Sequence, residues 1–205
     1  MPGRLFLTTP LAQVAETLGV SVEPVSDEPP RRNIAPGQDV ITLNASGLQR
    51  MRWGMIPVGR VNARGRPVME TIINARSETL FEKTAYTGTA RAVLPVDGWY
   101  ERTGKTRRKT AWQIRAKDRG LLFFAAITDA WTALNGAVLH QLAAVTCEPS
   151  ADVRDIHHRM GVLLDPADFS TWLNGTEAVV APLMRPWPDG LLSVEMADDV
   201  DWSAP

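Results

Sequence analysis

The segment Val40-Ile41-Thr42-Leu43-Asn44-Ala45-Ser46-Gly47-Leu48-Gln49-Arg50-Met51-Arg52-Trp53 decides the fold class of this chain. It holds two short runs with apolar positions, Val40 to Leu43 and Leu48 to Trp53, on either side of a polar tetrapeptide that contains Gly47. Two such runs around a short turn are typical of a β-hairpin. The segment therefore predicts antiparallel pairing as the basis of the sheet.

Outward from this hairpin, strands come in runs with helices inserted between them. The predicted strands are Arg91 to Val96, Trp112 to Arg115, Leu121 to Ile127, Val138 to Thr146 and Val162 to Leu164. The predicted helices are residues 11–18, which follow Thr9 and Pro10 and end before Gly19, then Glu78 to Thr84, Pro166 to Leu173 and Thr176 to Leu183. This order favours an α+β fold in one domain, residues 1–205, with a mostly antiparallel sheet or barrel.

The composition is that of a soluble globular protein and excludes several classes. With 205 residues, 44% of them hydrophobic and 22% charged, the chain can bury a substantial core. Its longest apolar run, Leu121 to Ile127, is too short to cross a bilayer, and the first residues lead into no signal-peptide core. A single cysteine, Cys147, cannot form an internal disulfide, and its place in an apolar strand predicts a buried, inert thiol. We expect a cytoplasmic protein.

Charge is strongly segregated along the chain. Residues 31–120 hold 18 Lys or Arg against 7 Asp or Glu, a net charge of +11, and the remainder holds 4 against 16, or −12. A basic half can attract the phosphates of a nucleic acid. The alternative is an ordinary solvated surface in which folding mixes the two charge types again.

Three polar clusters follow predicted strands or lie in loops, where catalytic groups are commonly placed. They are residues 74–78 (NARSE), 97–101 (DGWYE) and 156–160 (IHHRM). In isolation each could also be a turn cap or a surface group. The basic run over residues 102–109 is a solvated hairpin tip or a phosphate-contacting loop. Phosphate-binding, dinucleotide-binding and zinc motifs are absent, and three histidines with one cysteine predict no structural metal.

Six segments in order resemble the signature blocks of the SOS-response-associated peptidase family, the abasic-site DNA processing proteins. They are residues 1–6 (MPGRLF), 33–37 (NIAPG), 53–57 (WGMIP), 73–78 (INARSE), 97–101 (DGWYE) and 156–160 (IHHRM). The resemblance implies an α+β fold with a small closed barrel and peripheral helices. It also implies a positively charged cleft for single-stranded or junction DNA with an abasic site, no cofactor, no metal and a monomeric protein. A protein with that function is expected to associate with the nucleoid when DNA is damaged.

The resemblance also implies roles for individual residues. In the family a cysteine at position 2, exposed when the initiator methionine is removed, condenses with the opened sugar of an abasic site to give a thiazolidine. The same site is credited with removing a short N-terminal extension from the protein itself. In this chain position 2 is Pro2, so the thiol is missing. The implied catalytic group is therefore Pro2, Asn74, Glu101 and His157, and the implied DNA-binding residues are Arg4, Asn33 and Arg76.

In those roles Asn74 holds the sugar or the N-terminus, Glu101 handles protons at the amine, and His157 acts as acid or base in opening the sugar. Arg4 and Arg76 clamp the phosphates that flank the lesion. Three functions remain open from the sequence: a DNA-processing enzyme that reacts through the amine of Pro2, a module that binds damaged DNA without reacting, and a peptidase that uses Glu101 and His157.

Overall fold

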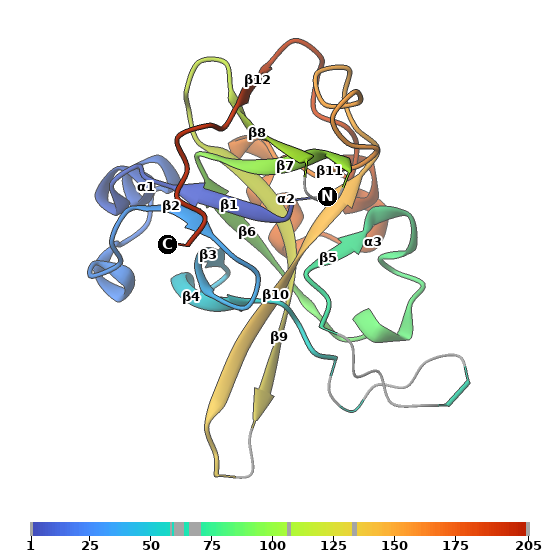
Figure 1. Ribbon diagram of the computed structural model, residues 1–205. Helices are drawn as coiled ribbons and strands as arrows, with labels where there is room; N and C mark the ends of the chain where they lie inside the picture. Colours follow the sequence, from blue (N-terminus) through green and yellow to red (C-terminus); the bar gives the residue numbers. More distant parts are fainter. Residues whose placement is uncertain are drawn as a thin grey trace.

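In the computed structural model, which describes residues 2–57, 59, 64–65, 71–105, 108–132 and 135–203, five strands close into a barrel. They are β3 (Asp39–Asn44), β4 (Gly47–Trp53), β6 (Ala90–Val96), β9 (Leu122–Thr132) and β10 (Val138–Cys147). β4, β3, β6, β9 and β10 pair antiparallel in this order, and a parallel pairing of β10 with β4 closes the ring. The long β9–β10 hairpin projects below the barrel in Figure 1. The fold is thus the predicted α+β type with a closed, mostly antiparallel barrel.

The upper part of β10 also carries two short strands that bring distant segments together. β5 (Asn74–Arg76) pairs parallel with residues 144–146 of β10, and β11 (Met160–Gly161) pairs antiparallel with residues 146–147. The loop between β10 and β11 contains His157. One end of β10 therefore lies next to both the strand that starts at Asn74 and the loop that contains His157.

A second sheet packs across the top of the barrel (Figure 1). Its order is β12 (Leu192–Met196), β8 (Arg108–Ala116), β7 (Gly98–Lys105), β1 (Arg4–Leu7) and β2 (Arg31–Ile34), and all neighbours pair antiparallel. In this sheet Arg4 lies opposite Tyr100 and Glu101 lies opposite Trp112.

Asp97 forms the junction between the barrel and the second sheet. It is buried between β6 and β7, and its carboxylate accepts hydrogen bonds of 2.5 to 2.9 Å from the backbone N–H and hydroxyl groups of Thr8 and Thr9. The next residue, Gly98, approaches β8 so closely that an added Cβ would lie 2.1 Å from the carbonyl oxygen of Ile114. Asp97 therefore supports the fold, although it lies in a cluster that the sequence marked as a candidate site.

The helices are short and peripheral. α1 (Leu11–Leu18) ends at Gly19, whose φ of 66° is the left-handed conformation that favours glycine, and α2 (Phe169–Asn174) is followed by α3 (Glu177–Val180). Single 3-10 turns occur at η1 (Glu23–Val25), η2 (Ser77–Thr79), η3 (Thr84–Tyr86), η4 (Pro166–Asp168) and η5 (Ala181–Leu183). Trp172 of α2 is fully buried and donates from its indole nitrogen to the carbonyl of Ala92 at 2.8 Å, which fixes α2 against β6. No helix in the described ranges is long and apolar enough to span a membrane.

Several predicted elements differ from those observed. The predicted helix Glu78 to Thr84 is wrong, because this segment holds only the 3-10 turn η2 and the start of η3. The predicted strand Val162 to Leu164 makes only an isolated bridge between Leu163 and Phe124, and β11 lies just before it. Glu101 lies inside a strand rather than at the end of one, because β7 begins at Gly98 and continues to Lys105.

Candidate active site

The candidate active site is a pocket of about 250 Å³ between β1, β7 and the loop before β11. Its walls are formed by Gly3, Arg4, Tyr100, Glu101, Arg102 and His157. The antiparallel pairing of β1 with β7 places Arg4 beside residues 100–102, and the loop after β10 brings His157 to the same opening. The structure thus brings together three of the residues singled out from the sequence, Arg4, Glu101 and His157.

Glu101 is suited to proton transfer near neutral pH. Its side chain is buried, with the residue 5% exposed, and this burial raises the pKa of the carboxyl to about 7. The side chain of Trp99, two residues earlier on the same face of β7, acts in the opposite direction on the pKa. A carboxyl with a pKa near 7 has both its acid and its base form present at neutral pH, as general acid-base catalysis requires.

His157 is held as a neutral ring. Its Nδ1 lies 3.0 Å from the backbone nitrogen and 3.2 Å from the carbonyl oxygen of Arg159, so it accepts from the N–H when the ring proton is on Nε2 and donates to the carbonyl when the proton is on Nδ1. Burial, together with the charge of the neighbouring His158, whose ring stacks at a centroid distance of 4.3 Å, lowers the pKa of the imidazole to about 4. At neutral pH His157 therefore carries no charge.

Arg159 fixes the loop that carries His157. Its buried guanidinium forms a bidentate ion pair with Glu78 (Nη2 to Oε2, 2.9 Å; Nη1 to Oε1) and donates to the carbonyl oxygen of Thr146 on β10 at 2.5 Å. The ion pair lowers the pKa of Glu78 to about 2. Because Glu78 follows β5, this contact joins the His157 loop to the strand that begins at Asn74. Glu78 and Arg159 lie inside two of the matched blocks, but no local pattern in the sequence indicates that they bind each other.

Asn74 connects the N-terminal segment to the same region. Its Nδ2 donates to the backbone carbonyl of Pro2 at 3.1 Å, and Pro2 is buried. Its Oδ1 is also buried, and no group in the described ranges donates a hydrogen bond to it. Buried acceptors are normally paired, so this oxygen is a position where a further hydrogen-bond donor would be stabilising.

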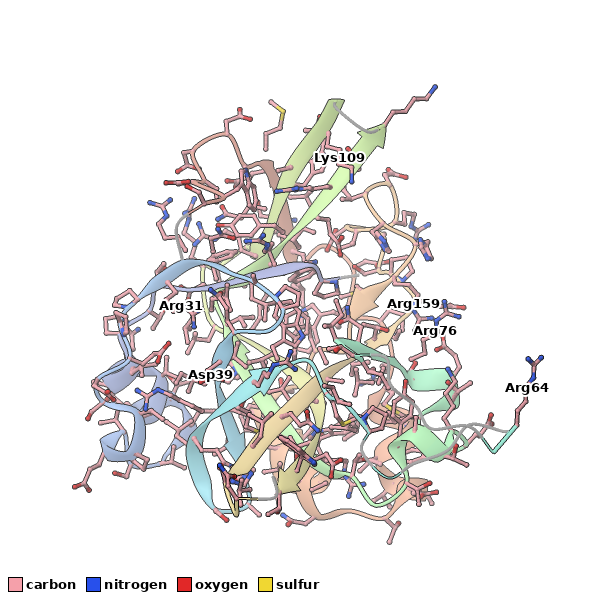
Figure 2. All side chains as sticks on the ribbon, turned by 60° about the horizontal axis from the view of Figure 1, so that its bottom comes forward. Arg31, Asp39, Arg64, Arg76, Lys109 and Arg159 are labelled. Atoms are coloured by element: carbon pink, nitrogen blue, oxygen red, sulfur yellow. The ribbon has the colours of Figure 1, made fainter. Side chains whose placement is uncertain are left out.

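Asn33 and Arg76, the remaining sequence candidates, do not line the pocket. Arg4 donates from Nη1 to Oδ1 of Asn33 at 2.7 Å, and Asn33 is itself buried and donates from Nδ2 to the carbonyl of Asp201 at 3.1 Å. Asn33 thus orients Arg4 and contacts the C-terminal segment. Arg76 is exposed at the end of β5 and does not line this pocket; it lies on the same side of the molecule as Arg159 (Figure 2). The middle of the basic run predicted as a hairpin tip, residues 106–107, lies outside the described residues.

Comparison with known proteins shows the family of this chain. The family model for the SOS response associated peptidase matches residues 1–201. The chain belongs to this family. The abasic site processing protein YobE of Bacillus subtilis is 31% identical over 183 residues, which cover 85% of this chain and 82% of YobE. The abasic site processing protein HMCES of Gallus gallus is 30% identical over 162 residues, 67% of this chain and 48% of that protein.

Solved structures share the fold. A protein from Bacteroides thetaiotaomicron superposes with a TM-score of 0.84 at 20% identity, covering 96% of this chain and 92% of that one. A phage-related protein from Bordetella bronchiseptica superposes with a TM-score of 0.69 at 25% identity, covering 96% and 94%. The closed barrel and the second sheet therefore recur in proteins with little sequence similarity.

In this member of the SOS response associated peptidase family, the single cysteine, Cys147, is a buried free thiol. It lies at the end of β10, is 3% exposed, and burial raises the pKa of its thiol to about 12. A thiol with that pKa carries almost no thiolate at neutral pH, and the thiolate is the nucleophilic form. Among the residues that the structure describes, no group of three or more His, Cys, Asp or Glu side chains could hold a metal ion.

Proposed function

We propose that this chain recognises abasic sites in single-stranded or junction DNA and reacts with them reversibly through the amine of Pro2. The observation that carries the proposal is the pocket that joins Glu101, His157 and Arg4, with the carbonyl of Pro2 held nearby by Asn74. The relatives named as abasic site processing proteins support abasic DNA as the substrate class.

The reaction requires protein that begins at Pro2, so that its nitrogen is a free secondary amine. The lone pair of this nitrogen forms a bond to the aldehyde carbon of the opened sugar, and the carbonyl π electrons move to the oxygen. The nitrogen then loses a proton and the oxygen gains one, which gives a carbinolamine. A protonated carboxyl next protonates the hydroxyl, which leaves as water while the nitrogen lone pair forms the C=N bond of an iminium.

Glu101 is the group we assign to these proton transfers. With a pKa of about 7, its carboxylate can accept the proton from nitrogen and its acid form can donate a proton to the departing hydroxyl. We assign His157 to the sugar, because in the tautomer whose Nδ1 accepts from Arg159 its Nε2–H can donate to a sugar oxygen and assist opening of the ring. We assign Oδ1 of Asn74, which has no hydrogen-bond partner among the described residues, as the acceptor for a sugar hydroxyl or for the reacting amine.

The iminium has two fates, and neither leaves a stable crosslink. Without a thiol on residue 2 no thiazolidine can close, so water can add to the iminium carbon and release the intact abasic site. Alternatively, a base removes a C2′ proton, the C–H electrons form a C2′=C3′ bond, and the 3′ phosphate leaves with the electrons of its C–O bond. The second route cuts the strand, which is lyase activity.

Arginine side chains around the pocket are the proposed contacts to the DNA backbone. Arg4 lines the pocket and Arg76 is exposed beyond Asn74, so the two can contact phosphates on either side of a bound sugar. The alternative function, binding of damaged DNA without reaction, is favoured by the absence of a thiol on Pro2 and uses the same surface.

Borohydride trapping distinguishes the two functions. Protein shown by intact mass spectrometry to begin at Pro2 is incubated with a single-stranded abasic oligonucleotide and cyanoborohydride, and the adduct is mapped by peptide analysis. The expected result is an adduct on residue 2 that is abolished by acetylation of the N-terminus. If the oligonucleotide binds but no adduct forms on residue 2, the chain is a binding module.

A further inference from the structure

A second pocket, of about 590 Å³, lies on the second sheet beside the candidate active site. The residues that matter for its chemistry are Thr8, Arg32, Tyr100, Gln113, Arg115 and Asp199. It spans β1, β2, β7 and β8, and it shares Tyr100 with the candidate active site. None of its arginines belongs to the set that the sequence assigned to DNA.

The pocket gathers donors and positive charge around one hydroxyl. Burial raises the pKa of Tyr100, and the charge of Asp199 adds to the rise. A hydrogen bond from Gln113 and the charges of Arg32 and Arg115 lower the pKa. The hydroxyl of Tyr100 donates to the backbone carbonyl of Arg32 at 3.0 Å, which holds it beside β2. Nε of Arg115 is buried and has no hydrogen-bond partner in the described ranges, while its guanidinium lies 5.7 Å from the ring centroid of Phe6. A buried guanidinium donor without an acceptor is costly, and an anionic ligand would supply the acceptor.

In the present structure the carboxylate of Asp199 provides the negative charge in this pocket. Its Oδ2 lies 3.0 Å from Nη2 of Arg32, and the two side chains are 74% and 63% exposed. Exposed ion pairs of this kind contribute little to stability, so a stronger anion can displace the carboxylate.

The C-terminal segment, residues 197–203, runs from β12 across β7 and β1 toward β2 (Figure 1). Ala197 N–H donates to the carbonyl of Ala111 at 2.9 Å. The indole of Trp202 packs edge-on against Tyr100 at 5.1 Å and lies 4.5 Å from the guanidinium of Arg102. Since Tyr100 and Arg102 also line the candidate active site, this segment covers the surface between the two pockets.

We propose that the pocket of Arg32 and Arg115 binds a phosphate group, and that the carboxylate of Asp199 occupies it when no phosphate is bound. The two guanidinium groups and the Gln113 amide provide donors for several phosphate oxygens. The assignment of this phosphate to a DNA strand rests on the proposed function. If the abasic sugar of a strand enters the first pocket, a neighbouring phosphate of the same strand can reach the second pocket, on the other side of Tyr100.

The first experiment measures binding of a fluorescein-labelled single-stranded oligonucleotide without an abasic site, by anisotropy at several salt concentrations. Asp199→Asn is expected to raise the affinity about two- to fivefold, as expected for removal of an exposed ion pair. Its control, Asp39→Asn, makes the same charge change at an exposed residue that lines neither pocket. Arg115→Gln is expected to lower the affinity and to reduce the salt slope by about one. Its reference is Arg185→Gln, which makes the same change of charge at an exposed arginine outside both pockets.

Combining the substitutions tests whether Asp199 acts through this pocket. In the Arg115→Gln background, Asp199→Asn should no longer raise the affinity. Arg32→Gln provides a second route to the same result if Arg115→Gln fails to fold, because the Arg32 side chain is largely exposed. If Asp199→Asn behaves like Asp39→Asn, and Arg115→Gln and Arg32→Gln behave like Arg185→Gln, the phosphate pocket is overturned while the proposed function stands.

A second experiment separates the two sources of phosphate. Inorganic phosphate is added at matched ionic strength, with chloride as reference, and the melting temperature is recorded for the wild type and Arg115→Gln. An Arg115-dependent rise in the wild type together with oligonucleotide binding supports a site for DNA phosphate. The same rise without oligonucleotide binding assigns the pocket to a small phosphate ligand and counts against the proposed function.

Discussion

Asn74 Nδ2 donates a hydrogen bond of 3.1 Å to the backbone carbonyl of Pro2, and this contact joins the N-terminal segment to β5 across 72 positions of sequence. The hydrogen bond fixes the backbone next to the proposed nucleophile, the nitrogen of Pro2. The other polar atom of the Asn74 side chain, Oδ1, is buried and has no hydrogen-bond partner in the described ranges.

Asn74→Asp should therefore slow formation of the trapped adduct about fivefold at saturating oligonucleotide, since it replaces the donor by an acceptor and a hydrogen bond contributes about 1 kcal/mol. The control is Asn44→Asp, because Asn44 acts as an acceptor from the backbone N–H of Ser46 and an aspartate keeps that bond. The rate is measured by quenched trapping and gel analysis. Equal rates in the two variants would show that Asn74 does not position residue 2 for reaction.

Pro2→Cys should convert the transient adduct into a heat-stable crosslink with abasic single-stranded DNA. The amine and thiol of an N-terminal cysteine can both bond to the aldehyde carbon, which closes a ring that the wild type cannot form. Denaturing gels after heating, without borohydride, measure the product. Absence of a crosslink in protein whose first residue is shown to be the introduced cysteine would mean that Asn74, Glu101 and His157 no longer form a competent site.

Glu101→Gln should stabilise the folded protein above neutral pH. The pKa of Glu101 rises from its ordinary value of 4.5 to about 7 on folding, so between these values the unfolded state ionises while the folded state stays protonated. The stability of the wild type is therefore lost as pH rises through this window, by about 3 kcal/mol from this group, and glutamine removes the loss. Urea unfolding at pH 4 and pH 8 measures the difference, with the exposed Glu16→Gln as control. A difference that does not change with pH would mean that Glu101 titrates normally.

Arg76→Ala and Arg4→Ala should each weaken binding of single-stranded DNA and lower the salt slope by about one. Each loses one proposed phosphate contact, whereas Arg119→Ala removes an exposed arginine in the β8–β9 turn and should leave the slope unchanged. Anisotropy across a salt series provides the slopes. Three identical slopes would show that the basic half of the chain is only a solvated surface.

Asp97→Ala should destabilise the fold by about 3 kcal/mol, because it leaves the backbone and hydroxyl donors of Thr8 and Thr9 without their shared acceptor. Asp118→Ala removes an acceptor of one hydrogen bond in an exposed turn and should change stability by less than about 1 kcal/mol. Denaturant unfolding measures both. A small effect at Asp97 would show that the junction between barrel and sheet is held by packing alone.

The amino-acid sequence determined the features that depend on local pattern. The hairpin of β3 and β4, the helix α1 with its terminal Gly19, and the strands β6, β9 and β10 follow from alternating or continuous apolar runs and from turn residues. The matched blocks determined the family and pointed to Arg4, Glu101 and His157 before their positions were known. The segment Glu78 to Thr84 was misjudged as a helix because helix-forming composition cannot show that Glu78 pairs with Arg159, 81 positions away.

Only the tertiary structure decided how these segments meet and what the side chains can do. β5 is three residues long and exists because β10 offers a free edge to it, which no local pattern reveals. The pKa of Glu101 depends on its burial inside β7. The structural role of Asp97 depends on two threonines that follow another strand, and the position of Asp199 depends on its ion pair with Arg32. Burial and long-range pairing are properties of the folded chain, because they arise from residues that are distant in sequence and adjacent only in space.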